Sequence, residues 1–399
     1  MTSHTITVRA GHPDFLDLEW DRSIVEWSTD RIVDLPKGIS RHEVRFVVYA
    51  EGTYVVKELP RRAARRDYTV LRELEGTGVK AVLPVGLVED RSDDPNDERS
   101  AALITRYADF SFSYRELLEG PGFGPRRKQM LDAFAWLLVE LHLIGCFWGD
   151  CSLSNVLYRY DADAIETIMV DAETAELHDE LSEGRRLEDL QIMIENVAGG
   201  MADIAALQGF DIDEADYELG EDVAARYLAL WTEVNQELVI PRDERFRIRE
   251  RIERLNDLGV TVDEVELIPV GEEQHMKVHI KIGVRDFHAR ELEELTGVRA
   301  LEQQARYILG DLHYFQALQA PDTDRVINAM KWRVQEFRPM MKRLRGATKT
   351  ADPIQAYCDI LHHRYILSSL AGQDVGTQAA VDDWFAAGEP GYPLDTSPT

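Results

Sequence analysis

WGDCSLSN, at residues 148–155, is the most informative segment of this 399-residue sequence, and VDAE follows it at residues 170–173. Asp150 and Asn155 stand five apart in a loop between a long apolar helix and an apolar strand, and Asp171 ends the next strand. In phosphoryl transfer from a nucleotide, one carboxylate orients and deprotonates a hydroxyl, while an amide oxygen and a second carboxylate hold the metal that bridges the phosphates. The D-x4-N spacing alone is common by chance, so this interpretation depends on the rest of the chain.

A lysine that fits the same chemistry lies upstream, in a predicted β-hairpin. Residues 44–49 (VRFVVY) and 53–59 (TYVVKEL) are β-rich and are joined by Glu51 and Gly52, which is typical of two antiparallel strands. Lys57 lies inside the second strand, where a charge is out of place unless it faces an anion or protects an exposed strand edge from aggregation. Together with the downstream motif, the order of these residues favours an anion-facing lysine.

The helix predicted at residues 61–75 supplies an acid for this lysine. Asp67 shares the buried stripe with the apolar residues at i+3, i+4 and i+7, which are Val70, Leu71 and Leu74. Glu73 comes six residues after Asp67, about 240° around the helix, and is expected to face solvent. We therefore predict that Asp67 pairs with Lys57, with Glu73 as the second candidate.

The composition excludes several classes of protein. With 45 Lys and Arg against 73 Asp and Glu, the formal net charge is −28, so bulk attraction to nucleic acid or to an anionic membrane surface is excluded. Three scattered cysteines, Cys146, Cys151 and Cys358, are too few for a disulfide framework or a paired zinc site. The most apolar stretch, residues 133–149, is too short and too polar for a membrane span. We therefore expect a reduced, cytoplasmic protein.

Together, these motifs resemble the protein-kinase-like superfamily. The resemblance is closer to RIO-type, aminoglycoside-phosphotransferase and lipopolysaccharide-kinase-like (Kdo/WaaP) members than to eukaryotic protein kinases. The segments GISRHEVRF at residues 38–46, RDYTVLREL at 66–74 and GDCSLSNVLYR at 149–159 are also similar to an actinobacterial kinase-like family with an extra C-terminal domain.

The resemblance implies catalytic and metal-binding roles for five residues. Lys57 resembles the strand lysine that contacts the α- and β-phosphates of ATP, and Asp67 occupies the position of the helix acid that holds it. Asp150 matches the catalytic base. Asn155 and Asp171 match the asparagine and aspartate that bind Mg²⁺.

The resemblance also implies a nucleotide-binding surface. Arg106, Tyr107 and Ala108 fall where the backbone of the hinge contacts adenine. Gly38 and Ser40 lie in the segment that corresponds to the phosphate-binding loop, which here contains one glycine instead of three.

The chain departs from the kinase pattern at several positions. The helix acid is Asp67 instead of glutamate, and Trp148 replaces the customary histidine two residues before the base. The metal-binding motif continues with Ala172 and Glu173 and lacks a glycine, which reduces the backbone freedom there. These departures leave two alternatives open: a nucleotide-binding pseudokinase, and a kinase-fold enzyme that transfers AMP.

We predict an α+β protein with a two-lobed, protein-kinase-like fold. The expected parts are an N-terminal extension at 1–30, a kinase-like domain at 31–208 (N-lobe 31–107, C-lobe 108–208), a mostly helical domain at 209–373 with strands near 265–284, and a tail at 374–399 that is disordered at its end.

The favoured function is Mg-ATP-dependent phosphotransfer to a hydroxyl of a small-molecule or other non-peptide acceptor. Only eighteen positions separate Asp171 from Asp189, where a new helix has already begun, so the chain lacks room for a peptide-docking activation segment. Asp189 is expected either to brace the backbone of the catalytic loop or to be a helix-terminal carboxylate favoured by the macrodipole.

Two basic segments are local exceptions in this acidic chain. The predicted strand around 275–281 carries alternating histidines and lysines, and a helix at 331–345 is rich in lysine and arginine. These two basic segments favour an anionic acceptor or partner. The alternative, that the region containing them only packs against the helical lobe, is equally open. Lys277 and Lys281, which alternate with His275 and His279, argue against a zinc site, because they would repel a cation.

Overall fold

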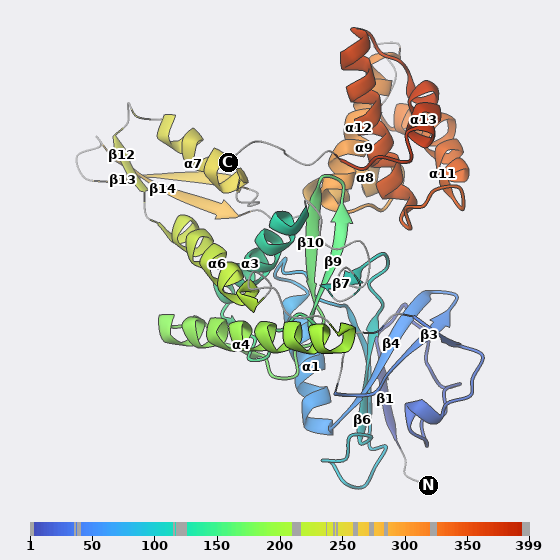
Figure 1. Cartoon of the computed structure of the whole chain (residues 1–399), viewed down its shortest axis with the longest axis vertical. Coiled ribbons are helices and arrows are strands. Elements are labelled where there is room, and N and C mark those ends of the chain that lie inside the picture. Colours follow the sequence, from blue (N-terminus) through green and yellow to red (C-terminus); the bar gives the residue numbers. More distant parts are fainter. Residues whose placement is uncertain are drawn as a thin grey trace. The chain divides into compact units, whose positions relative to one another are not determined.

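The computed structural model describes residues 4–35, 37, 41–114, 116, 126–209, 217–236, 238–241, 244, 246–257, 262–270, 275–282, 286–319 and 325–392. The chain forms two compact units. Unit 1 comprises Met1–Tyr158 and Thr167–Ile282, and unit 2 comprises Arg159–Glu166 and Gly283–Thr399. Figure 1 shows the chain coloured along its sequence.

Unit 1 begins with an antiparallel sheet that carries Lys57. The strand order is β1-β5-β6-β4-β3-β2, with bounds Thr5–Val8 (β1), Ile32–Val33 (β2), Val44–Tyr49 (β3), Gly52–Leu59 (β4), Pro84–Glu89 (β5) and Ala101–Arg106 (β6). The predicted hairpin is β3–β4, with Val44 opposite Lys57 and Tyr49 opposite Gly52. Helix α1 (Arg61–Leu74) packs on β4, β5 and β6, because its apolar stripe faces them.

Residues 4–30 are part of this lobe and not an appendage. They supply β1, which pairs with β5, and a short 3₁₀ helix, η1 (Ile24–Glu26). Phe15 and Ile24 are fully buried and share one core with sheet residues such as Val56. Apolar burial therefore places this segment within the lobe, where an extension was expected.

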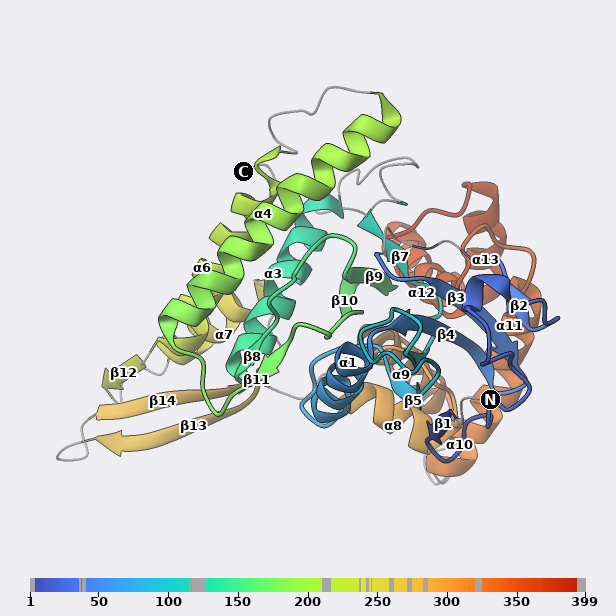
Figure 2. The ribbon, with the colours of Figure 1, turned by 90° about the horizontal axis from the view of Figure 1, so that it is seen from below.

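A mainly helical part of unit 1 follows the sheet. Its elements are β7 (Phe112–Ser113), α3 (Arg127–Leu143), β8 (Cys146–Phe147), β9 (Val156–Asp161), β10 (Ala164–Met169), β11 (Glu176–Leu177), α4 (Glu183–Gln208) and α6 (Leu219–Asn235). Helix α6 packs against α3 and α4, as Figure 2 also shows. The loop 148–155 lies between β8 and β9, and Asp171 follows β10, as the sequence predicted. The small sheet and helical lobe confirm the predicted fold class.

The boundary expected after residue 208 falls inside unit 1. Helix α6 continues the helical part, because Val223 and Tyr227 are fully buried. A second sheet follows, ordered β12-β14-β13, with bounds Leu238–Pro241 (β12), Val262–Val270 (β13) and His275–Ile282 (β14), and with helix α7 at Phe246–Asp257. On β13, Glu264 and Glu266 lie opposite Lys281 and His279 of β14, so acidic positions face the predicted basic strand.

Unit 2 is a helical domain that also contains the tip of the β9–β10 hairpin. Its helices are α8 (Phe287–Thr296), α9 (Glu302–Ala317), α10 (Arg325–Trp332), α11 (Arg338–Leu344), α12 (Pro353–Ala371) and α13 (Thr377–Ala386), with a π-helical segment at Arg333–Phe337. Asp161 at the hairpin tip accepts hydrogen bonds from the Gln303 and Gln304 amides at 3.1 and 2.8 Å, so it caps α9.

The expected tail instead contains a packed helix. Val381 and Trp384 of α13 are fully buried in the core of unit 2, together with Trp332 and Tyr357. In the basic helix region, Arg343 pairs with Asp382 at 2.6 Å. Among the described residues, no helix is long and apolar enough to span a bilayer.

Candidate active site

The predicted site residues converge on one cavity of about 490 Å³ in unit 1. The sheet supplies one wall, the loop 148–155 and Asp171 another, and α4 a third. The predicted residues that line it are Lys57, Arg106, Tyr107, Ala108, Asp150, Asn155 and Asp171. Gly38 and Ser40 lie outside the described residues.

Lys57 is surrounded by carboxylates. Its Nζ lies 2.6 Å from Asp171 Oδ2, 3.4 Å from Asp67 Oδ2 and 3.3 Å from Glu173 Oε2. Asp67 is fully buried, as its position on the apolar stripe predicted, whereas Glu73 is exposed. Burial raises the pKa of Asp67, and the Lys57 ammonium acts in the opposite direction. Lys57 and Asp67 are therefore in contact, and the lysine also meets two carboxylates from the segment after β10.

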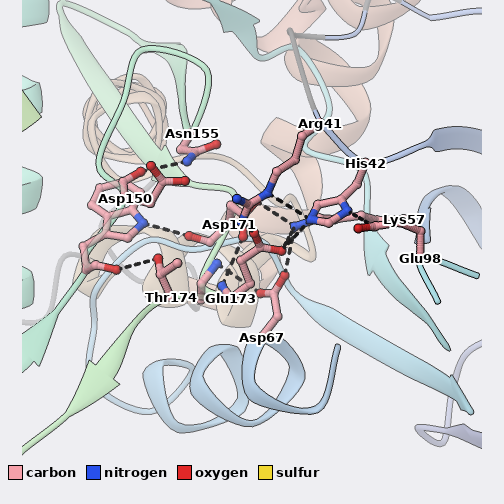
Figure 3. A network of polar contacts seen from close by, with 12 residues as sticks. Arg41, His42, Lys57, Asp67, Glu98, Asp150, Asn155, Asp171, Glu173 and Thr174 are labelled. Carbon is pink, nitrogen blue, oxygen red and sulfur yellow. Dashed lines mark hydrogen bonds and ion pairs between the residues drawn. The ribbon is translucent and has the colours of Figure 1, made fainter. Parts of the chain in front are cut away.

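Glu173 connects this cluster to the segment after the expected phosphate-binding loop (Figure 3). Its buried carboxylate forms an ion pair with Arg41 and lies 3.0 Å from His42 Nε2. His42 Nδ1 contacts Glu98 Oε2 at 2.6 Å. Burial and the nearby Lys57 lower the pKa of His42, while Glu98 raises it. The sequence reasoning did not identify these contacts.

Asp150 and Asn155 form the opposite side of the site. Asn155 Nδ2 donates to the backbone carbonyl of Asp150 at 2.8 Å, so the amide oxygen points away from it (Figure 3). Within the described part of the chain, no donor reaches that amide oxygen. Asn196 of α4 donates to Asp150 Oδ1 at 3.0 Å. Burial, followed by the charge of Asp171, raises the pKa of Asp150, while Arg41 and the two amide side chains act to lower it.

Asp189 braces the loop that carries Asp150. Its fully buried carboxylate accepts hydrogen bonds from the backbone amides of Trp148 at 2.7 Å and Gly149 at 2.8 Å. A third contact, at 3.0 Å, comes from His142 Nε2, and His142 Nδ1 contacts the Tyr227 hydroxyl at 2.7 Å. Of the two interpretations offered for Asp189, the geometry supports the bracing role.

Trp148 connects the same loop to Asp171. Its indole Nε1 donates to the Asp171 carbonyl at 2.8 Å, and its own carbonyl accepts a hydrogen bond from Thr174 Oγ1 at 2.9 Å. The residue that stands two positions before Asp150 therefore connects this loop to the segment that carries Asp171.

The expected adenine-contacting segment begins at Arg106, the last residue of β6. The Arg106 amide donates to the Leu83 carbonyl at 2.8 Å and the Tyr107 amide to the Thr53 carbonyl at 3.1 Å. Among the described residues, no acceptor is found for the Ala108 amide.

The three cysteines are free and buried, and burial raises the pKa of the Cys151 thiol well above its ordinary value. This environment fits a packing role. No group of three or more His, Cys, Asp or Glu residues in the described part of the chain is arranged to hold a metal ion.

Comparisons with known proteins agree with this architecture. Residues 50–210 match the lipopolysaccharide kinase (Kdo/WaaP) family, and residues 229–388 match a domain of unknown function, DUF4032. No curated protein matches the chain in sequence. The match at residues 50–210 supports a kinase-like phosphotransferase.

Two solved structures are similar to parts of the chain. The complex of WaaP with acyl carrier protein is 17% identical with a TM-score of 0.33, covering 57% of this chain and 88% of that chain. The yeast RNA polymerase II CTD kinase complex CTDK-1 is 17% identical with a TM-score of 0.27, covering 39% of this chain and 49% of that chain.

Proposed function

We propose that this member of the protein-kinase-like superfamily transfers the γ-phosphoryl group of Mg-ATP to a hydroxyl of a small, non-peptide acceptor. The observation that carries the proposal is the convergence of Lys57, Asp150, Asn155 and Asp171 on a single cavity of about 490 Å³. In this role, Asp150 accepts the proton of the acceptor hydroxyl.

The Lys57–Asp171 ion pair fits a site for Mg-ATP. Lys57 Nζ and Asp171 Oδ2 now lie 2.6 Å apart and neutralise each other. Phosphate oxygens are negative, like the Asp171 carboxylate, and Mg²⁺ is positive, like the Lys57 ammonium. On binding, Lys57 exchanges a carboxylate for phosphate oxygens, and Asp171 exchanges an ammonium for the metal, so neither charge is left uncompensated. Asp67, at 3.4 Å from Lys57 Nζ, keeps the ammonium in place during this exchange.

Asn155 and Asp171 are a suitable pair of ligands for Mg²⁺. The Asn155 amide nitrogen is occupied by the Asp150 carbonyl, so the oxygen is the atom available to a cation. Mg²⁺ is usually held by one or two protein oxygens together with water and phosphate oxygens, which fits a two-residue set. When bound, the metal would supply positive charge that offsets the charge of the phosphate oxygens.

The adenine base is expected to contact the Ala108 amide. The neighbouring amides of Arg106 and Tyr107 already donate to backbone carbonyls of the sheet, so neither is available without opening a strand. These hydrogen bonds support Ala108 as the hinge contact among the three residues predicted from the sequence.

The non-peptide nature of the acceptor is inferred from the short connection after Asp171. Only β11 lies between this residue and α4, which begins at Glu183. A segment that orders on phosphorylation and docks a peptide needs more chain than this.

Radiolabelled ATP tests the proposal directly. The protein is incubated with Mg²⁺ and either γ-labelled or α-labelled ATP, with pooled cytosolic metabolites as acceptors. Transfer of the γ-label supports the phosphotransferase, whereas transfer of the α-label identifies an AMP-transferring enzyme. Asp150→Asn is expected to bind ATP with unchanged affinity and to transfer the label about 10²–10⁴-fold more slowly, because the general base is missing. ATP binding without any transfer overturns the proposed reaction.

One observation favours the alternative of a nucleotide-binding module without transfer. Lys57 has three carboxylates within 3.4 Å, and two of them, Asp171 and Glu173, compete with phosphate for the ammonium. A module of this kind binds ATP, transfers neither label, and retains its function in the Asp150→Asn variant.

A further inference from the structure

We propose that Asn196 is a positioning residue for Asp150, so that α4 orients the base of the proposed reaction as well as the backbone of its loop. The inference rests on the proposed function for its chemical meaning. Its geometric basis is independent: Asn196 Nδ2 donates to Asp150 Oδ1 at 3.0 Å and to the Cys151 carbonyl at 3.2 Å.

Helix α4 holds the loop at two points, with a hydrogen-bond acceptor at one point and a donor at the other. Asp189 and Asn196 are seven residues apart, which is close to two helical turns, so both lie on one face of α4. The carboxylate of Asp189 accepts from two backbone amides at the start of the loop. The amide of Asn196 donates to two oxygens a few residues later. A single rigid element therefore sets both the path of the loop and the direction of its acidic side chain.

The core of unit 1 holds this face of α4 in place. Met193, about one turn before Asn196, and Val197, the residue after it, are fully buried. Both hydrogens of the Asn196 amide nitrogen have acceptors in the loop, so this side chain has one preferred orientation.

A neutral donor suits the task of orienting a base. A hydrogen bond to one carboxylate oxygen restricts rotation of the Asp150 carboxyl group and presents it in one direction to a hydroxyl in the cavity. A lysine or arginine at this position would stabilise the ionised carboxylate more strongly and make it a weaker base. An amide restricts the rotation with a smaller effect on basicity.

The test compares Asn196→Leu with Gln191→Leu. Both replace an amide of α4 by leucine, but Gln191 is exposed and its side-chain amide donates to Glu195 Oε1 at 2.8 Å, away from the loop. The assay is Mg-ATP hydrolysis with water as the acceptor, which requires no knowledge of the physiological acceptor. Asn196→Leu is expected to lower kcat by roughly tenfold or more with an unchanged KM for ATP, because base catalysis contributes about 10²–10⁴-fold in total. Gln191→Leu is expected to retain the wild-type kcat.

A double-mutant cycle separates positioning from a general structural role. If Asn196 acts through Asp150, adding Asn196→Leu to Asp150→Asn causes no further loss of kcat. A full additional loss in that background, or a raised KM for ATP with an unchanged kcat, overturns the proposal.

Crystal structures of the wild-type protein and of Asn196→Leu with Mg-ADP provide a measurement that does not depend on activity. We expect the Asp150 carboxyl group to adopt a different or split orientation in the variant. The same single orientation in both structures overturns the proposal, whether or not the protein hydrolyses ATP. An absence of hydrolysis by the wild-type protein counts against the proposed function and leaves this structural test decisive for Asn196.

Discussion

The position of α4, which carries both Asp189 and Asn196, depends on a close approach to α6. A Cβ atom built on Gly220 of α6 would lie 2.8 Å from the Ile194 Cα atom and 3.1 Å from its carbonyl oxygen. These are backbone atoms of α4, so they cannot move aside as a flexible side chain would. For Gly199, on α4 itself, no described atom outside its own stretch of helix lies within 4 Å of the built Cβ atom. The two glycines therefore predict opposite effects of the same substitution.

The magnitudes follow from two effects. Replacing glycine by alanine within a helix stabilises it by about 1 kcal/mol, with a smaller gain in the first turn, where Gly220 lies. Forcing an extra methyl group into a packed interface typically costs about 1–3 kcal/mol. Gly199→Ala is therefore expected to raise the free energy of unfolding by about 1 kcal/mol. Gly220→Ala is expected to lower it, and the two variants should differ by roughly 1–3 kcal/mol.

Urea denaturation followed by circular dichroism measures both variants against the wild-type protein. In a cooperative unit of this size, about 1 kcal/mol corresponds to a shift of roughly 2–4 °C in Tm, so thermal melting provides a second measurement. If Gly220→Ala is at least as stable as Gly199→Ala, then α6 does not pack on α4 as described. In that case α6 does not fix the position of Asp189 and Asn196.

Three further predictions concern buried carboxylates. Asp67→Asn is expected to weaken ATP binding in calorimetry, because it removes a fixed anion beside Lys57, whereas Glu73→Gln at an exposed position should leave it unchanged; equal effects would show that the helix phase is wrong. Glu173→Gln is expected to tighten ATP binding several-fold, because one carboxylate fewer competes with phosphate for Lys57, and weaker binding would refute this competition. Burial raises the pKa of Asp161 to about 7 from an ordinary value of 3.8, so its carboxyl group stabilises unit 2 fully below the ordinary pKa and loses this contribution as pH rises through about 7. Asp161→Asn keeps an acceptor for the α9 amides and should show a flatter stability from pH 5 to pH 8 in urea denaturation, and parallel curves for the two proteins would contradict the assignment.

The sequence predicted the contacts that depend on local periodicity. The Lys57–Asp67 pair followed from an alternating strand and a helical stripe, because both patterns state which way a side chain points. The spacing of Asn196, two turns after Asp189 on the same helix, indicates that the two side chains share a face. The helical pattern alone does not show that this face contacts the loop carrying Asp150.

The Glu173 contacts depend on long-range packing and had no such signal. They bring together residues 41–42, 98 and 173, and Glu98 belongs to a segment whose acidic composition is typical of a solvated loop. The predicted boundary after residue 208 lies close to the end of the family match at residues 50–210, but the compact unit continues to Ile282. The amphipathic pattern of α6 indicates that one face is buried, but it does not identify the helices that bury it.

At the positions that depart from the kinase pattern, different residue types still form hydrogen bonds or ion pairs with the site residues. Trp148 holds the Asp171 carbonyl at 2.8 Å through its indole nitrogen, although it is not a histidine. Asp67 is one methylene shorter than glutamate, yet it reaches Lys57 at 3.4 Å and accepts the Ala172 amide at 3.1 Å. That second bond connects the helix acid directly to the residue after Asp171, so the motif without glycine is fixed by a side chain. These contacts make the departures weak grounds for inferring an inactive site. The strongest argument against turnover is instead the competition of Glu173 for Lys57.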